Sequence, residues 1–315
     1  MRRREFITLL GGAGAAWPVA ARAQQSAMPL VGVLNSLGSD AFRAFLSGLG
    51  ETGYIEGRNI VLELRTTTRA DQVPLLAAEL VQQRAAVIAT LGGLSASATI
   101  AATTTTPVVF TIGGDPVELG LVSNLSRPAG NVTGITFFAA ELLQKQVGLI
   151  RELAPRADAL GVLVNPKNPR HKADLTKVQA AGESLGFKAY PVNAETEVDL
   201  VSAFNILAER RASALLVCGD AFFLRAIAAI AVLAAHHAIP SIFAARDFAQ
   251  VGGLMAYGAS LTEAYRQNGI YVGRILKGEK PGDLPVLQPT KFELLINLRA
   301  NFARLESGGF PTLYQ

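Results

Sequence analysis

Short apolar runs alternate with amphipathic stretches along most of this chain, and this alternation constrains the fold more than any other feature. Apolar runs of strand length occur in the first part of the chain at residues 30–34, 59–64, 86–91 and 108–112. Between them, apolar residues recur at helical spacing from Ser39 to a stop at Gly53, and again in residues 71–83 and 95–104. Such a strand–helix succession predicts a parallel sheet with helices on both faces.

The alternation stops and then restarts, which indicates two units. Residues 125–134 are rich in turn formers and end the first series. The second series has expected strands at residues 159–164, 189–192, 214–217, 241–243 and 253–257. Its expected helices cover residues 142–153, 174–185, 198–210, 222–236 and 263–276. We therefore expect two similar α/β units joined near residues 131–137.

Residues 1–23 have the three parts of an export signal. A basic start precedes a short apolar run, which ends in the small-x-small sequence Ala21-Arg22-Ala23. The sequence Arg3-Arg4-Glu5-Phe6-Ile7 also resembles the twin-arginine signal. The apolar run is short and broken by Pro18, which argues against a membrane anchor. We expect a periplasmic protein, exported by the twin-arginine or the general secretory route.

Composition and missing motifs exclude several classes of protein. Part of the formal net charge of +4 comes from the arginines of residues 1–23, and no basic run with interleaved aromatics follows, so we expect no nucleic-acid partner. The lone Cys218 lies in an apolar strand pattern and is expected to pack in a core. No dinucleotide, P-loop or nucleophile-elbow motif occurs outside the signal, and no histidine pair has metal-binding spacing. We therefore expect no cofactor, no metal and no catalytic residues.

Small and polar residues follow the expected strands. Ligands of open parallel sheets bind beyond the carboxyl ends of the strands, and the residues there are Asn35, Ser36, Gly92, Gly93, Ser95, Gly113 and Asp115 in the first unit, and Asn165 and Asp220 in the second. Free backbone N–H groups at helix starts suit a carboxylate, and the two aspartates suit an ammonium group. Ordinary helix capping explains the same residues, so both readings stay open.

Aromatic residues supply a second kind of candidate. Phe137 and Phe222 could stack on an aromatic ligand, although each belongs to a Phe-Phe pair in which one ring is expected to be core. Tyr257 is expected where the chain crosses between the units. The mixture of Ser, Asn, Gly, Asp and Phe favours an amino acid or a small aromatic carboxylate over a sugar.

Several segments resemble the exported substrate-binding proteins of ABC transporters, in the branch that includes tryptophan and tyrosine binders. The resemblance covers nearly all of residues 1–305. The matching segments are residues 3–7, 21–25, 45–57, 59–60, 114–117, 127–134, 252–258 and 278–281. The tail after Leu305 departs from the family pattern.

This resemblance implies a two-lobe fold of the periplasmic-binding-protein type I class, with three crossovers at a hinge. The crossovers are expected near residues 131–136, 255–260 and 284–287. The first lobe would comprise residues 28–133 and 261–285, the second residues 134–258 and 288–306, and residues 307–315 would form a tail.

The resemblance also implies a function. A monomeric binding protein would close around a small-molecule ligand and present it to an ABC permease in the inner membrane. Two alternatives remain: a periplasmic sensor that presents its closed form to a signalling receptor, and an exported enzyme.

Overall fold

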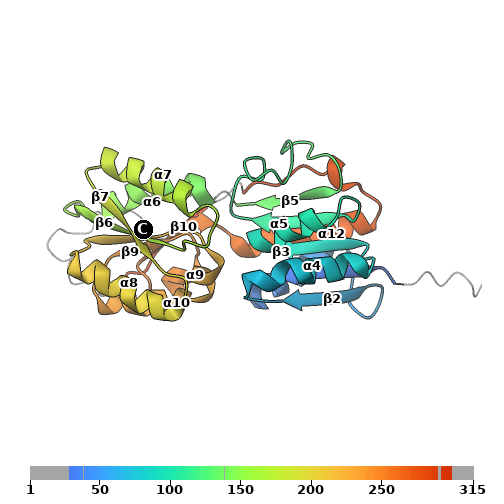
Figure 1. Ribbon diagram of the computed structural model, residues 1–315, viewed down its shortest axis with the longest axis horizontal. Coiled ribbons are helices and arrows are strands. Elements are labelled where there is room, and N and C mark those ends of the chain that lie inside the picture. The colour runs from blue at the N-terminus through green and yellow to red at the C-terminus, as the bar shows by residue number, and fades with distance from the viewer. Residues whose placement is uncertain (1–27, 38, 138, 290–291, 300–315) are drawn as a thin grey trace, which may run out of the picture.

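The chain forms two α/β lobes that lie side by side (Figure 1). The computed structural model describes residues 28–37, 39–137, 139–289 and 292–299. The proposed export signal and the proposed tail lie outside these residues. Each lobe has its own sheet with helices on both faces, which confirms the two-lobe α/β fold that the strand–helix alternation predicts.

The first lobe is built on a five-stranded sheet in which every pair of neighbours is parallel. In order across the sheet the strands are β2 (Val61–Thr66), β1 (Leu30–Asn35), β3 (Val87–Leu91), β4 (Val108–Ile112) and β5 (Val132–Thr136). Its helices are α3 (Ser39–Glu51), α4 (Val73–Gln82), α5 (Gly93–Ala102) and α12 (Leu261–Leu276), with short 3-10 turns at Ala70–Gln72 and Pro281–Asp283.

Alternating residues of β1 show how this sheet buries both faces. Val31 and Val33 pack in the core under α3 and α12, whereas Leu34 packs in a separate core with α4. Successive side chains of a strand point to opposite faces, so a strand covered on both sides needs a continuous apolar run. The run at residues 30–34 is apolar for this reason.

The second lobe has a six-stranded sheet. In order across the sheet the strands are β11 (Phe292–Ile296), β10 (Met255–Ala259), β9 (Ser241–Phe243), β8 (Ala214–Val217), β6 (Ala159–Val164) and β7 (Lys188–Asn193). Only β11 runs antiparallel to its neighbour among the described strands. The helices are α6 (Ala139–Leu153), α7 (His171–Ser184), α8 (Glu197–Glu209), α9 (Ala221–Arg225), α10 (Ile227–His236) and α11 (Asp247–Gln250).

Strand β5 corrects the sequence-based division of the chain. Residues 134–136, assigned to the second lobe from the sequence, pair with β4 in the first sheet. A Cβ at Gly134 would lie 2.3 Å from the carbonyl oxygen of Phe110, so only glycine allows this close approach. Placed among turn formers, the segment resembles a loop, and for that reason the strand was missed.

The chain passes between the lobes in the segments that follow strands, and not within the strands themselves. The chain leaves the first lobe after β5 and returns between β10 and α12. The expected third crossover at residues 284–287 is instead part of the first lobe, because Leu284 and Val286 are buried in its cores and the Leu287 amide donates to the Gly134 carbonyl at 2.9 Å. The third passage therefore lies between Leu287 and the start of β11 at Phe292.

One expected helix is divided in two. Residues 222–236 were expected to form a single helix, but the chain breaks at Ala226, which ends α9 and begins α10. The break makes Arg225 the last residue of α9. Among the helices that the structure describes, none combines the length and apolar character needed to cross a bilayer.

Cys218 directly follows β8 and is 4% exposed, in agreement with the core role predicted from the sequence. Burial raises the pKa of its thiol, so the reactive thiolate is suppressed. We expect the folded protein at pH 8 to react negligibly with Ellman's reagent over minutes, and the urea-unfolded protein to react at once. Rapid reaction of the folded protein would contradict this burial.

Candidate functional site

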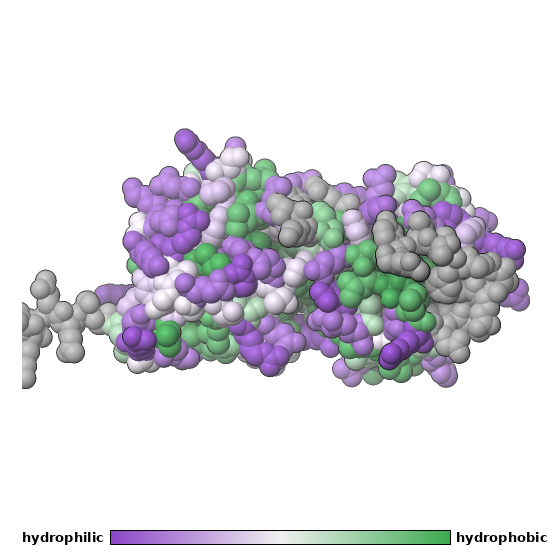
Figure 2. Space-filling view, turned by 180° about the vertical axis from the view of Figure 1, so that it is seen from behind, coloured by the Kyte–Doolittle hydropathy of each residue, from purple (hydrophilic) through white to green (hydrophobic). Residues whose placement is uncertain are grey.

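The sequence-predicted polar residues gather where the carboxyl ends of the two sheets face each other. Among the described residues, two hydrogen bonds cross this boundary between the lobes, one to the carbonyl of Ser36 and one to the carbonyl of Gly113. Figure 2 shows the lobes touching along a boundary where hydrophilic residues are exposed, with larger apolar areas on the lobes themselves. The boundary thus brings together groups that are far apart in the sequence.

We call the residues of each lobe that face this boundary its wall. The end of β1 forms one part of the first-lobe wall. Asn35 and Ser36 are buried, and the Asn35 Oδ1 atom accepts a hydrogen bond from the Leu37 amide at 2.9 Å. The Ser36 hydroxyl donates to the carbonyl of Leu91 at 3.2 Å. Gly92 has a φ of +123°, and a Cβ there would lie 2.4 Å from the Ser36 Oγ atom, so this turn requires glycine.

Helix α5 begins at this turn. Gly92 is its N-cap, Gly93 is exposed, and Ser95 lies in the first turn. Ser95 is fully buried, and its hydroxyl has no hydrogen-bond partner among the described residues. The first amides of a helix lack partners within it and carry a partial positive charge, so this part of the wall offers hydrogen-bond donors.

Gly113, Asp115 and Phe137 complete the first-lobe wall. A Cβ at Gly113 would lie 2.5 Å from the Phe137 ring, so glycine lets this ring pack against the end of β4. Phe137 is half-buried and packs against the first-lobe core. The Asp115 Oδ1 atom accepts from the Val117 amide at 2.7 Å and the Glu118 amide at 3.3 Å, so this carboxylate caps a turn.

The second-lobe wall is organised around the Asp220 carboxylate. Its Oδ1 atom accepts from Asn165 Nδ2 at 3.0 Å and from the Phe222 amide at 2.8 Å, and its Oδ2 atom accepts from Asn168 Nδ2 at 3.0 Å. Asp220 therefore caps α9 and also ties the loop after β6 to the end of β8. The capping role of Asp220 is thus confirmed, and its role in ligand binding stays a prediction.

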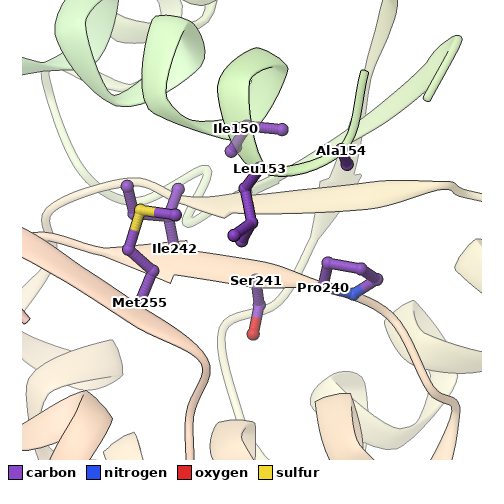
Figure 3. A pocket seen from close by; sticks show the side chains of 7 residues that line it. All are labelled: Ile150, Leu153, Ala154, Pro240, Ser241, Ile242 and Met255. Carbon is purple, nitrogen blue, oxygen red and sulfur yellow. The ribbon is translucent and has the colours of Figure 1, made fainter. Parts of the chain in front are cut away.

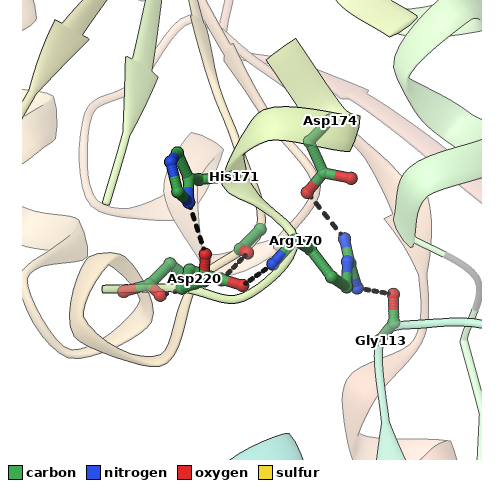
Figure 4. Close-up of polar contacts among 7 residues, drawn as sticks. Gly113, Arg170, His171, Asp174 and Asp220 are labelled. Atoms are coloured by element: carbon green, nitrogen blue, oxygen red, sulfur yellow. Dashed lines mark hydrogen bonds and ion pairs between the residues drawn. The ribbon is translucent and has the colours of Figure 1, made fainter. Parts of the chain in front are cut away.

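Asn168 extends this network to Arg170. Its Oδ1 atom accepts from the Arg170 amide at 3.0 Å, and its side-chain amide also donates to the Gly219 carbonyl at 3.1 Å. The Arg170 guanidinium then lies between two partners (Figure 4): Nη2 is 2.8 Å from Asp174 Oδ2, and Nη1 donates to the Gly113 carbonyl across the boundary. One arginine thus joins a buried carboxylate of the second lobe to the backbone of the first.

Arg225 makes the other of these two hydrogen bonds across the lobe boundary. Its Nη1 atom donates to the Ser36 carbonyl at 2.9 Å. Burial lowers the pKa of this guanidinium, and the negative charge of Asp220 opposes that effect in part. Arg225 is nevertheless an exposed residue, so the lobe boundary leaves this cation accessible from solvent.

Sequence reasoning missed Asn168, Arg170, Asp174 and Arg225. Arg170 and Asp174 have the i, i+4 spacing of an ion pair on a helix, and Arg225 lies five residues after Asp220. These signals are present in the sequence, but the residues lie several positions beyond the strand ends, where the rule for open parallel sheets does not point. Long side chains can act at a sheet edge from positions several residues further along.

The expected aromatic residues behave differently from one another. Phe222 is half-buried in the first turn of α9, with its ring 5.4 Å from that of Phe223, the fully buried member of the pair.

Tyr257 was expected at a crossover but lies inside β10, where it pairs with Leu294. Its ring lies 6.3 Å from that of Phe292 and packs on the second-lobe core, so its described contacts stay within that lobe. The register of β10, which the sequence does not show, places it there.

An apolar hollow between α6 and the second sheet is distinct from this boundary (Figure 3). Its lining consists of Ile150, Leu153, Ala154, Pro240, Ser241, Ile242 and Met255. Ser241 is the single hydroxyl in this lining, so the hollow lacks the convergent polar groups of a ligand site. Within the described residues, no three His, Cys, Asp or Glu side chains are placed to hold a metal ion.

Comparison with known proteins assigns the chain to a family. The family model described as "ABC transporter substrate binding protein" matches residues 31–305. A tyrosine-binding protein of Clostridioides difficile (strain R20291) is 24% identical over 258 residues, which cover 82% of this chain and 74% of that protein.

Solved structures agree on the fold. A conserved domain protein of Vibrio cholerae is 27% identical with a TM-score of 0.81, covering 88% of this chain and 95% of its own. An ABC domain from Streptococcus pneumonia, solved in complex with L-Trp, is 22% identical with a TM-score of 0.80, covering 91% and 97%.

Proposed function

The chain belongs to the ABC transporter substrate-binding protein family, and we propose that it binds an amino acid or a small aromatic carboxylate between its lobes. The matching family is one of substrate-binding proteins, so the proposal includes no catalytic step. The observation that carries the proposal is the meeting of polar side chains and backbone groups from both sheets at one boundary, crossed by Arg170 and Arg225.

The physical mechanism is a shift between open and closed lobe arrangements. A ligand that contacts both walls binds the closed arrangement better than the open one, and this difference in affinity drives closure. The glycine-lined first wall supplies backbone donors, and the Asp220 network supplies a carboxylate on the second. No bond in the ligand is made or broken.

The chemistry of the two walls supports this ligand class. Asp220, with Asp115, is suited to an ammonium group, and Phe137 and Phe222 offer half-buried aromatic faces. The names of two similar proteins mention tyrosine and L-Trp, so these amino acids are the first probes to use.

We also propose an exported protein that works with a membrane permease. The features of residues 1–23 support export to the periplasm, and family membership supports a permease that accepts the closed, loaded form. A monomer suffices for this role, since both walls of the proposed site come from one chain.

A thermal-shift screen tests the ligand class. The purified protein is heated with L-tyrosine, L-tryptophan, benzoate or glucose, and isothermal titration calorimetry follows each shift. A ligand at 100 times its dissociation constant adds about 2.7 kcal/mol to the unfolding free energy, which gives a clear rise in Tm. We expect a rise with the aromatic amino acids and none with glucose. Stabilisation by glucose alone would contradict the ligand class, and chemical conversion of any probe would restore the enzyme alternative.

A further inference from the structure

Arg225 has a position that helix capping and core packing do not explain. It is the last residue of α9 in the second lobe, yet its Nη1 atom donates a hydrogen bond of 2.9 Å to the Ser36 carbonyl in the first lobe. A guanidinium has five N–H donors in a planar fork. No other hydrogen bond of this side chain to a described residue is found, so the fork has donors to spare.

Among the residues that the structure describes, Arg225 forms no ion pair, so its positive charge has no carboxylate partner there. The negative charge of Asp220 raises the pKa of the Arg225 guanidinium, but Asp220 forms no ion pair with it. Both oxygens of this carboxylate already accept hydrogen bonds, from Asn165, Asn168 and the Phe222 amide. Arg170, the other arginine at the boundary, differs because it is neutralised by the buried Asp174 at 2.8 Å. Arg225 is an exposed residue at the lobe boundary, so its remaining N–H donors are open to an anionic ligand, and charged hydrogen bonds of this kind are strong.

The facing wall is also suited to an anion. Ser36 directly follows β1 and donates through its own hydroxyl to Leu91, next to Gly92, the N-cap of the ten-residue helix α5. The start of this helix offers amides that lack intrahelical partners. Ser95 adds a fully buried hydroxyl without a described partner in the first turn. Donors from one lobe therefore approach the boundary that Arg225 reaches from the other.

We propose that Arg225 binds the carboxylate of the ligand and makes a carboxylate a requirement for tight binding. Resting on the proposed function, this inference assigns one residue to one ligand group. Phe222 lies one helical turn before Arg225 on α9, so the helix presents an aromatic ring and a cation at neighbouring positions. An aromatic carboxylate of amino-acid size matches that pair.

The test compares acids with their amides. Isothermal titration calorimetry measures L-tryptophan against L-tryptophanamide, and L-tyrosine against L-tyrosinamide, on the wild type, Arg225→Gln and Arg225→Lys. Arg246→Gln is the matched control, because Arg246 pairs with Glu293 on the outside of the second lobe. Melting curves verify that each variant is folded.

We expect the wild type to prefer each acid over its amide by about 10- to 150-fold, the range for hydrogen bonds to charged groups. Arg225→Gln should weaken acid binding by a similar factor and leave amide binding nearly unchanged. Arg225→Lys should keep part of the preference, because lysine keeps the charge but loses the planar fork. Arg246→Gln should bind like the wild type.

Other results separate the possible failures. If the wild type binds acid and amide equally, or if Arg225→Gln weakens both equally, Arg225 only bridges the lobes and the inference is overturned while the proposed function stands. If the wild type binds none of these acids, both are overturned. Should Arg225→Gln not fold, the acid–amide comparison on the wild type and on Arg225→Lys decides the question.

Discussion

Replacing Gly269 with alanine is expected to lower the free energy of unfolding by about 3 kcal/mol, because the new methyl group has no space. Gly269 lies in α12, where a Cβ would be 2.1 Å from the carbonyl oxygen of Phe45 and 2.6 Å from the amide nitrogen of Leu49. Both atoms belong to the backbone of α3, so a side-chain rotation cannot relieve the clash. The two helices would have to move apart.

The reason lies in the close packing of α3 against α12. Gly48 of α3 faces the same interface, where a Cβ would lie 1.8 Å from the Arg266 carbonyl oxygen. Two helices whose backbones approach this closely need residues without side chains at the crossing. Since α12 follows the crossover at Ser260, this contact also fastens the returning chain to the first lobe.

Urea unfolding followed by circular dichroism measures the effect, and Gly50→Ala is the matched control. Gly50 is exposed in α3, the helix that α12 packs against, and a Cβ there would meet nothing within 4 Å. Alanine is favoured over glycine in a helix, so we expect this control to raise stability by about 0.5 to 1 kcal/mol. Opposite signs for the two substitutions would support the packing, and a loss of similar size in both would refute it.

The second large effect concerns Asp174. Replacing it with alanine is expected to cost about 3 kcal/mol, because it leaves the Arg170 guanidinium partly buried without its carboxylate. Asp174 is 2% exposed and Arg170 is 18% exposed, so solvent cannot fully compensate either charge. The measurement is again urea unfolding.

A double-mutant cycle isolates this pair. Arg170→Met removes the cation, and we expect the double variant Arg170→Met, Asp174→Ala to lose less than the sum of the two single variants. Asp71→Ala is the control, because the Asp71–Arg69 pair is exposed on both sides and should leave stability nearly unchanged. Additive losses in the cycle would show that the pair does not interact energetically.

We expect the same pair to influence the proposed closure, since Arg170 donates to the Gly113 carbonyl of the other lobe. We expect Arg170→Met to favour open arrangements in the ligand-free protein, which small-angle X-ray scattering detects as a larger radius of gyration. The backbone of Arg170 is held separately by Asn168, so the loop itself should keep its conformation.

Much of the fold could be predicted from local pattern. The apolar run at residues 30–34, the helix stops and the turn-rich residues 125–134 act through the backbone preferences and burial of near neighbours, which a sequence shows directly. The residues after each strand, such as Asn35 and Asn165, could be named because parallel strands place their carboxyl ends at one edge. Their role in binding stays a prediction.

The tertiary structure decided what depends on contacts between distant residues. Gly134 belongs to a strand because Phe110 lies beside it, and Tyr257 belongs to the second lobe because β10 pairs with β11. Arg170 and Arg225 became site candidates only when their guanidinium groups were seen to reach Gly113 and Ser36 of the other lobe. Local preference acts over a few residues, whereas register and lobe contacts join residues 57 and 189 positions apart, so these contacts could not be read from the sequence alone.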